Sequence, residues 1–226
     1  MTRPAAGLTQ NDPRAAEFRA DGVAEAAKLL SGFAPGCRVI GLTMGQFSLL
    51  DLIKATLNKT GPAHVALSTW TMGIRDAENA NFLVDRGLLL SLTLLVDRSF
   101  PTRQPEYCAR IVEMFGADSI RMTQTHAKFA LIENDEYGVA IRSSMNLNRN
   151  PRFEQFDLDD DRSIVAFFRS HMVDIFERVA PGMAISEHDS HLGFTQCPLG
   201  AGGQLDGSTP KWAPRSKRRT KKRKWS

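Results

Sequence analysis

The sequence predicts an α/β fold in which a mixed β-sheet is flanked by helices on both faces. Segments with helical periodicity alternate with short apolar segments typical of strands, which is the pattern of α/β proteins. Two further strands, forming a hairpin, are indicated between residues 126 and 146. The chain has 226 residues, of which 42% are apolar, and this is sufficient for one domain with a substantial core.

The first part of the chain already shows this alternation. Residues 15–33 have helical periodicity and are followed by Pro35 and Gly36, which end helices. A short apolar strand is predicted at 38–42, and an amphipathic helix follows at 47–58. A helix, a strand and a helix therefore open the domain.

The same pattern continues through the middle and the end of the domain. Residues 64–70 are predicted to be a strand and residues 76–86 a helix. Residues 88–96 are almost continuously apolar, which is typical of a strand buried on both faces, and a helix is expected at 104–115. After the hairpin, residues 161–180 carry an apolar stripe at helical spacing and end at a Pro-Gly pair.

Composition divides the chain into four parts. Residues 1–14 are expected to be a flexible N-terminus, 15–185 the folded catalytic domain, 186–210 a linker and 211–226 a basic tail. Nine of the 29 Lys and Arg residues lie in the tail, which has no acidic residue, so 20 basic and 25 acidic residues precede it. Because like charges repel and little apolar surface is available, the tail is expected to be disordered.

The predicted hairpin brings polar side chains to one patch of the sheet. Strand residues two apart share a face, so His126 and Lys128 point to one side, as do Ser144 and Asn146. A turn of three or five residues within 134–138 pairs His126 with Asn146 and Lys128 with Ser144.

Arg142 lies on the second strand of the same hairpin, two residues before Ser144. In the expected register its side chain shares the face of Lys128. Arg142 is therefore expected to bind substrate as a second cation, and the alternative is that it pairs with a nearby acidic residue.

These residue types suit a phosphodiester passing through a more negative transition state. His126 is the predicted nucleophile, which would attack phosphorus and form a covalent phosphohistidine. Lys128, Ser144 and Asn146 are expected to hold the non-bridging oxygens. The alternative is a buried hairpin whose polar side chains hydrogen-bond with one another.

This segment resembles the signature of the phospholipase D superfamily, H-x-K-x4-D-x6-G-S-x-N. The triplets HAK and SMN match it at residues 126–128 and 144–146. Ser143 stands where the family usually has glycine, the acidic position falls on Glu133, and the turn is longer than in the pattern. The resemblance is specific only over residues 126–157, and it implies the mixed sheet with helices on both faces.

The resemblance also implies a metal-independent phosphodiesterase that needs no cofactor. The family carries a downstream glutamate that orients the nucleophilic histidine, and Glu154 is the best candidate, with Asp157 as a substitute. A second group must protonate the leaving oxygen and later activate water. Family members normally take it from a second copy of the motif, so the resemblance implies a homodimer with two His126 side chains at the site.

The basic tail indicates a polyphosphate partner. A mobile cationic segment binds nucleic acid by releasing counterions, without reading the sequence. Trp212 and Trp225 bracket the tail and are candidates for stacking on bases. A solvated tail or a basic address signal is the alternative. The tail residues expected to bind nucleic acid are Lys217, Arg218, Arg219, Lys221, Lys222, Arg223 and Lys224.

Membrane and metal partners are not expected. No segment approaches the roughly 18 consecutive apolar residues of a membrane span, and the first residues lack the apolar run of a signal peptide. Cys37, Cys108 and Cys197 are odd in number and have no metal-ligand spacing, which suggests reduced thiols in a cytoplasmic protein. The acidic and histidine residues within 187–191 have no framework to hold a metal ion.

The sequence therefore predicts a cytoplasmic nuclease of the single-motif bacterial or phage type, acting on DNA or RNA. A phospholipid phosphodiesterase or transferase is one alternative, because polybasic tails also bind anionic lipid. The other is a catalytically idle nucleic-acid-binding protein, in which the altered glycine and aspartate positions mark lost catalysis.

Overall fold

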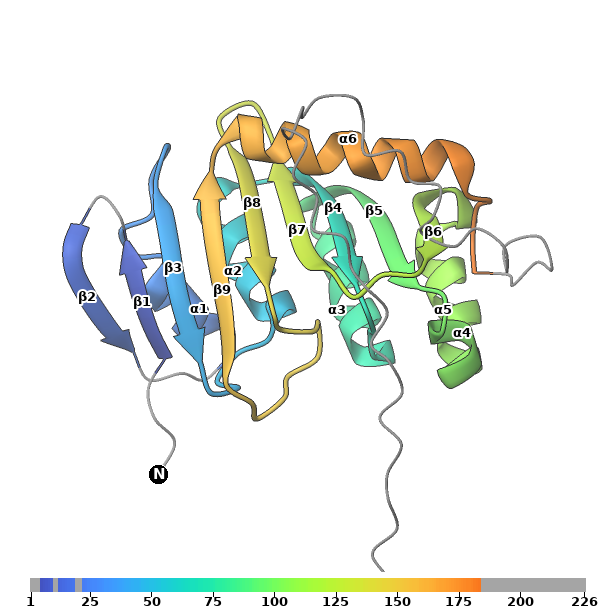
Figure 1. Cartoon of the computed structure of the whole chain (residues 1–226), viewed down its shortest axis with the longest axis horizontal. Coiled ribbons are helices and arrows are strands. Elements are labelled where there is room, and N and C mark those ends of the chain that lie inside the picture. The colour runs from blue at the N-terminus through green and yellow to red at the C-terminus, as the bar shows by residue number, and fades with distance from the viewer. Residues whose placement is uncertain (1–4, 10–11, 19–21, 184–226) are drawn as a thin grey trace, which may run out of the picture. The chain divides into compact units, whose positions relative to one another are not determined.

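A nine-stranded mixed sheet forms the centre of the fold, with strand order β2-β1-β3-β9-β8-β7-β4-β5-β6 (Figure 1). The computed structural model describes residues 5–9, 12–18 and 22–183, with side chains from residue 22 onward. The strands are β1 (Ala5–Thr9), β2 (Asp12–Phe18), β3 (Arg38–Thr43), β4 (Ala63–Thr69), β5 (Leu89–Asp97), β6 (Ile120–Thr123), β7 (Lys128–Glu133), β8 (Gly138–Ser143) and β9 (Glu154–Asp160).

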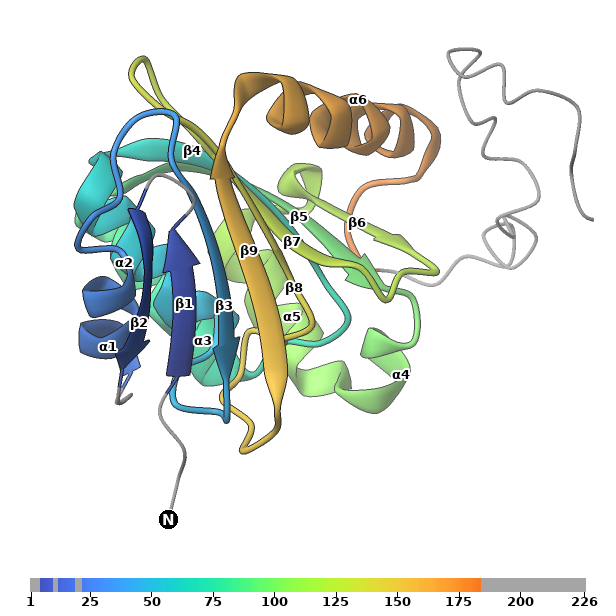
Figure 2. The ribbon, with the colours of Figure 1, turned by 60° about the vertical axis from the view of Figure 1, so that its left-hand side comes forward.

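Helices cover both faces of this sheet, as predicted. They are α1 (Gly22–Leu29), α2 (Leu49–Thr60), α3 (Ile74–Asp85), α4 (Phe100–Arg103), α5 (Pro105–Phe115) and α6 (Arg162–Arg178), with a short 3-10 helix at Ala117–Ser119. Figure 2 shows α6 on one face and the other helices on the opposite face. The predicted class, an α/β fold with a mixed sheet, is therefore confirmed.

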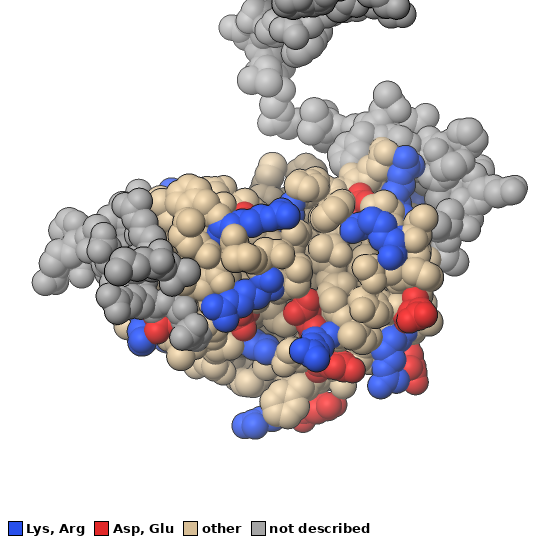
Figure 3. Space-filling model, turned by 90° about the horizontal axis from the view of Figure 1, so that it is seen from below, with Lys and Arg blue, Asp and Glu red and all other residues tan. Residues whose placement is uncertain are grey.

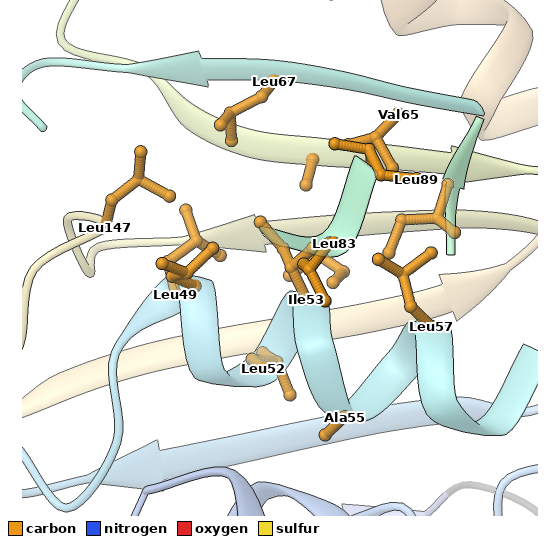
Figure 4. Packing of buried hydrophobic residues seen from close by; sticks show 14 of the residues in the cluster. Leu49, Leu52, Ile53, Ala55, Leu57, Val65, Leu67, Leu83, Leu89 and Leu147 are labelled. Atoms are coloured by element: carbon orange, nitrogen blue, oxygen red, sulfur yellow. The ribbon is translucent and has the colours of Figure 1, made fainter. Parts of the chain in front are cut away.

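Each face has its own apolar core. The larger core contains the buried side chains of α2 and α5 together with Ala130, Ile132, Val139 and Ile141 of the central hairpin. In Figure 4, Leu49, Ile53 and Leu57 of α2 lie in one cluster with residues of β4. The smaller core lies under α6, where the alternate hairpin residues Phe129 and Leu131 contact this helix. Alternating burial on two faces accounts for the nearly unbroken apolar sequence of the hairpin strands.

The sheet has a parallel half and an antiparallel half. β4, β5 and β6 run parallel to one another, whereas β7, β8, β9 and β3 are paired antiparallel. The two halves meet where β7 pairs antiparallel with β4. Consequently β3, β4, β5 and β8 end at the edge of the sheet where β7 and β9 begin, which we call the lower edge (Figure 1).

The start of α2 is tied to this lower edge. Ser48 caps the helix: its Oγ accepts a hydrogen bond from the Asp51 N–H at 3.1 Å, and the Asp51 carboxylate accepts one from the Ser48 N–H at 3.0 Å. This capping box satisfies two N–H groups that the helix leaves unpaired. The N–H of Leu49 donates to the carbonyl of Asn146 at 3.2 Å, so α2 and the segment after β8 meet here.

The N-terminal region differs from the prediction of a flexible segment followed by a helix at 15–33. Ala5–Thr9 and Asp12–Phe18 are strands that pair antiparallel, and β1 also pairs with β3. The helix begins only at Gly22. The pairing gives β3 a partner on each side and adds two ladders of backbone hydrogen bonds, so backbone pairing prevails over the local helical pattern. The predicted linker and basic tail, 186–226, lie outside the described residues.

Candidate active site

The side chains singled out by the sequence gather at the lower edge of the sheet. His126 and Lys128 stand at the start of β7, Ser144 follows the end of β8, and Glu154 begins β9. These three strands are adjacent in the sheet. Figure 3 shows this edge from below, with Lys and Arg side chains spread across it and several of them next to Asp or Glu.

His126 and Lys128 are in direct contact. The Lys128 Nζ lies 3.0 Å from Nδ1 and 3.2 Å from Nε2 of the imidazole. Lys128 is buried, with 8% of its surface exposed, whereas the His126 side chain is exposed. Burial lowers the pKa of the Lys128 ammonium, and the negative charge of Glu154 acts in the opposite direction. The arrangement places an accessible imidazole beside a sheltered cation.

Ser144 and Glu154 form a second pair. The Ser144 hydroxyl donates to the Glu154 carboxylate, and it accepts a hydrogen bond from the Gln155 N–H at 3.0 Å. Glu154 was expected to orient His126, but its carboxylate holds Ser144, while both imidazole nitrogens of His126 lie within hydrogen-bond distance of Lys128. Glu154 thus affects the site through Ser144 and through its charge near Lys128.

The predicted register of the hairpin is wrong by one residue. Lys128 pairs with Ser143 rather than Ser144, and Glu133 pairs with Gly138, which leaves a four-residue loop. Asn134 explains this loop, because its Oδ1 accepts hydrogen bonds from the Glu136 N–H at 3.0 Å and the Tyr137 N–H at 2.8 Å. An asparagine that binds the backbone ahead of it in this way stabilises a tight turn.

The new register moves Arg142 to the other face of the sheet. Arg142 pairs with Phe129, whose side chain packs under α6, so it points away from the face of Lys128. It forms ion pairs with Asp157, at 2.7 Å, and with Asp159. The expectation that Arg142 binds substrate is therefore corrected to the alternative, an ion pair with neighbouring acids.

The two residues that differ from the family signature, Glu133 and Ser143, both form hydrogen bonds or ion pairs in the fold. Glu133 lies at the far end of β7 from His126 and forms an ion pair with Arg169 of α6. The Ser143 hydroxyl donates to the carbonyl of Gln155 at 2.9 Å and accepts from the Met145 N–H at 2.9 Å. Glu133 and Ser143 therefore stabilise the hairpin. Neither substitution relative to the family signature removes a polar side chain from the lower edge.

Asn146 lies in the segment that joins β8 to β9. Its carbonyl binds the first N–H of α2, and its side-chain Oδ1 is buried without a hydrogen-bond partner in the described part of the chain. Asn148, in the same segment, has the same property. Buried polar atoms without partners are costly and uncommon in folded proteins, and an amide oxygen is satisfied only by a hydrogen-bond donor.

The segment that carries His126 is held by residues that the sequence did not indicate. Ser68, at the end of β4, donates to the carbonyl of Ala127 at 3.0 Å. The Ala127 N–H donates to Thr125 Oγ1 at 3.1 Å, and the Thr125 N–H donates to Asp97 Oδ2 at 3.1 Å. These bonds connect His126 to β4 and β5, which are distant in sequence.

A close backbone approach positions the loop between β8 and β9. Gly45 has φ +79°, and a Cβ at this position would overlap the carbonyl oxygen of Asn150. Arg149 donates from Nε to the Gly45 carbonyl at 2.8 Å. The turn after β3 is therefore packed against the loop that leads to Glu154. Thr43 and Gln46 of this turn are hydrogen-bonded to each other at 2.6 Å and buried, as in an ordinary strand-to-helix turn.

An aromatic residue adjoins His126 from the parallel half of the sheet. Trp70 follows the last residue of β4, and the centroid of its indole lies 5.7 Å from that of the His126 ring. The guanidinium carbon of Arg103 lies 4.0 Å from the Trp70 ring centroid. Neither residue belongs to the motif, and the sequence indicated only that Trp70 is an aromatic residue at the end of a predicted strand.

The remaining expectations concern the basic tail, a metal site and a membrane span. The tail residues expected to bind nucleic acid, Lys217 to Lys224, and the segment 187–191 lie outside the described residues. Within the described residues, no cluster of three or more His, Cys, Asp or Glu could hold a metal ion. None of the helices in the same part of the chain is long and apolar enough to cross a membrane.

Comparison with protein-family models and with curated protein sequences found no match. Solved structures similar to this chain include Nuc, a phospholipase D family member from Salmonella typhimurium, with 12% identity over 57% of this chain and 88% of Nuc (TM-score 0.43). NucT from Helicobacter pylori is 14% identical over 64% of this chain and 99% of NucT (TM-score 0.47). TrmBL2, an archaeal chromatin protein described as showing a novel mode of DNA binding, is 10% identical over 62% of this chain and 52% of its own (TM-score 0.40).

Proposed function

We propose that this protein is a metal-independent phosphodiesterase that cleaves nucleic acid through a phosphohistidine on His126. The observation that carries the proposal is the exposed imidazole of His126 next to the buried ammonium of Lys128, 3.0 Å from Nδ1. An accessible imidazole is a nucleophile, and a fixed cation beside it stabilises the charge that grows on the phosphoryl oxygens.

The reaction has two displacements. A ring nitrogen of His126 forms a bond to phosphorus, and the bond from phosphorus to the leaving oxygen breaks. As the bond to phosphorus forms, Lys128 exchanges its contact with the imidazole for a non-bridging oxygen, where negative charge grows. In the second step water attacks the phosphohistidine, the phosphorus–nitrogen bond breaks, and His126 is regenerated. The Ser144 hydroxyl and the Asn146 amide are the proposed further donors to the phosphoryl oxygens.

A proton must reach the leaving oxygen, and a proton must be removed from water. The described residues hold one copy of the His126 and Lys128 pair. We therefore propose a homodimer, in which the partner's His126 gives the proton to the leaving oxygen and then accepts one from water. A two-fold axis beside the lower edge would bring the two imidazoles together.

Exposed apolar side chains of β3 and of the segments beside it are a candidate contact for this dimer, on the sheet face that carries Arg142. Ile40 and Leu42 of β3 are 38% and 40% exposed, and Met44 and Phe153, which flank the paired residues of β3 and β9, are 36% and 64% exposed. Contiguous exposed apolar residues are typical of protein contacts. Leu42→Lys is expected to dissociate the dimer and lower activity, whereas Leu90→Lys, a change at another exposed leucine, should alter neither. Light scattering after size-exclusion chromatography measures the mass.

The catalytic test uses a small diester and an oligonucleotide in the presence of EDTA. Wild-type protein is expected to hydrolyse both, and acid-labile phosphate should be trapped on His126. His126→Ala is expected to lose at least about a thousandfold in kcat. Equal activity of the two proteins would reject the catalytic role and favour an idle nucleic-acid-binding protein. Faster hydrolysis of a phospholipid than of any nucleic acid would favour the lipid phosphodiesterase.

Nucleic acid is proposed as the substrate because of the basic tail. Removing residues 211–226 is expected to weaken binding of DNA and to flatten its dependence on salt, by about 0.9 in the log–log slope for each phosphate that the tail neutralises. Hydrolysis of the small diester should persist, since the proposed reacting groups lie at the lower edge. Loss of small-diester hydrolysis on deletion would show that the tail belongs to the reacting site.

A further inference from the structure

Trp70 and Arg103 form an aromatic and cationic pair directly beside His126. The Trp70 indole is tilted by 54° to the imidazole, with 5.7 Å between the ring centroids. On the same indole, the guanidinium carbon of Arg103 lies 4.0 Å from the ring centroid. Trp70 is partly exposed and Arg103 is exposed. The pair therefore places an exposed guanidinium, lying over the indole, next to the proposed nucleophile.

Arg103 is held over the indole from two sides. Its Nη2 donates to the carbonyl of Trp70 at 3.1 Å, and its Nε donates to the Ser99 hydroxyl at 3.1 Å. Ser99 in turn donates to Asp97, the residue that holds the segment before His126. The guanidinium is thus fixed before any ligand binds, which reduces the entropy lost on binding.

The chemistry of this pair matches an unpaired nucleobase. Bases stack on aromatic rings and on guanidinium planes, and the positive charge of arginine adds attraction to the nearby phosphate. A base inside a duplex is already stacked on its neighbours, so its face is not available. We infer that Trp70 and Arg103 form a base-stacking subsite beside His126 and that the substrate is single-stranded nucleic acid. This inference rests on the proposed function.

A purely structural role for the pair is the competing explanation. Arg121 shows what such a role looks like, since its guanidinium lies over Phe176 and also binds the carbonyls of Asp118, Ile120 and Phe176. Phe82, in the last turn of α3, and Arg86, just after this helix, form another exposed pair, with 5.5 Å between ring centroid and guanidinium carbon, at the opposite end from the lower edge. Only the Trp70 pair, among these three, also contacts His126. Phe82→Ala is consequently the matched control.

The first test compares two diesters with the same leaving group. Thymidine 5′-(p-nitrophenyl phosphate) carries one base, and methyl p-nitrophenyl phosphate carries none. Trp70→Ala is expected to reduce the ratio of kcat/KM for the nucleoside ester over the methyl ester about tenfold. Trp70→Phe should retain most of the ratio, and Phe82→Ala should retain all of it. If Trp70→Ala lowers kcat/KM equally for both esters, the ratio is unchanged and Trp70 acts only by packing against His126. If Trp70→Ala lowers kcat/KM for neither ester, the ratio is again unchanged and the subsite is also rejected.

The second test measures binding without turnover. A single-stranded oligonucleotide containing 2-aminopurine loses fluorescence when the modified base stacks on an aromatic ring. In the His126→Gln background, binding should quench this fluorescence, and both Trp70→Ala and Arg103→Ala should weaken the affinity about tenfold. The Phe82→Ala control carries the same tail, so binding by the tail cancels in the comparison. A duplex of the same sequence should show no effect of either variant.

The two tests separate this inference from the proposed function. If wild-type protein hydrolyses neither ester, the phosphodiesterase proposal fails, and the fluorescence experiment alone then decides whether a base stacks at Trp70. If both esters are hydrolysed and the single-stranded oligonucleotide binds equally well with and without Trp70, the phosphodiesterase proposal stands and the subsite is rejected.

Discussion

The side chain of Asp97, at the end of β5, accepts a hydrogen bond at 3.1 Å from the backbone N–H of Thr125, the residue before His126. Asp97 also accepts hydrogen bonds from the N–H and the hydroxyl of Ser99. One carboxylate therefore fixes both the proposed nucleophile's segment and the start of α4.

We expect Asp97→Ala to lower kcat for a small diester about 10- to 100-fold with little change in KM. The substitution should move His126 away from the position needed for attack on phosphorus, whereas the groups that bind the substrate stay in place. Asp97→Asn should lose less, since an amide oxygen still accepts a hydrogen bond. Steady-state kinetics measures both. Asp85→Ala, at an exposed position on α3, is the control, and a rise in KM without a change in kcat would contradict the positioning role.

Gly45 provides a test of the loop that leads to Glu154. Gly45→Ala places a Cβ against the Asn150 carbonyl at a residue with φ +79°. Gly61→Ala, at φ +81° and ψ −172°, meets no atom within 4 Å and therefore measures a backbone cost alone, about 1–3 kcal/mol. The overlap at Gly45 should destabilise the protein by about 1–3 kcal/mol more.

Urea denaturation measures these two stabilities, and kinetics should show lost activity in Gly45→Ala alone. Equal stability of the two variants would mean that the close approach of the two loops contributes nothing.

Lys128 is expected to make stability depend on pH. Burial lowers the pKa of its ammonium in the folded state relative to the unfolded value of about 10.4. Below the pKa that Lys128 has in the folded state, burying its charged ammonium lowers the stability of the protein. This loss of stability disappears as the pH rises from the pKa of Lys128 in the folded state to its pKa in the unfolded state. Lys128→Met removes the cost, so this variant should be more stable than wild type near neutral pH.

The stability gap between Lys128→Met and wild type should narrow as the pH approaches the unfolded value of about 10.4. Urea denaturation at a series of pH values tests this trend, and a gap that widens with pH would refute it. Lys59→Met, at an exposed position, should change stability by less than about 0.5 kcal/mol. Diester hydrolysis should be lost in Lys128→Met and kept in Lys59→Met.

The corrected position of Arg142 has a direct consequence for mutagenesis. Arg142→Met should leave diester hydrolysis within about twofold of wild type, since the side chain points away from the face of Lys128. It should destabilise the fold by about 1–3 kcal/mol, because Asp159 is buried and, within the described part of the chain, keeps Arg38 as its one cationic partner, at 3.0 Å. Arg110→Met, which breaks an exposed pair with Glu113, should cost less than about 1 kcal/mol. A large loss of activity in Arg142→Met alone would restore its role in substrate binding.

The sequence predicted the elements that rest on apolar periodicity. The helices found at Leu49–Thr60 and Pro105–Phe115 and the strand at Leu89–Asp97 lie within two residues of their predicted bounds. β9 was not predicted, because its acidic residues Asp157 and Asp159 become compatible with a strand only through Arg38 and Arg142 on the neighbouring strands. Such pairing is decided by the sheet as a whole and not by the local sequence.

The candidate site was predictable only in part. Adjacent positions of one hairpin, such as His126 and Lys128, are placed together by local rules, and the structure shows their contact. The register depended on the Asn134 side chain, whose hydrogen bonds to the turn select its length. Trp70 and Asp97 come close to His126 only because β7 lies beside β4 and β4 beside β5. No spacing in the sequence encodes that strand order.

Strands running in both directions bring the proposed reacting groups to the lower edge of the sheet. The opposite edge of the sheet therefore carries turns between the elements. The turns at residues 61–62, 87–88 and 134–137 all lie there. Gly87 is exposed and has open space around it. A fluorophore or affinity peptide inserted in this turn would lie at the edge of the sheet opposite His126, and exposed turns of this kind tolerate insertion. An insertion in this turn is expected to leave the side chains at the lower edge in place.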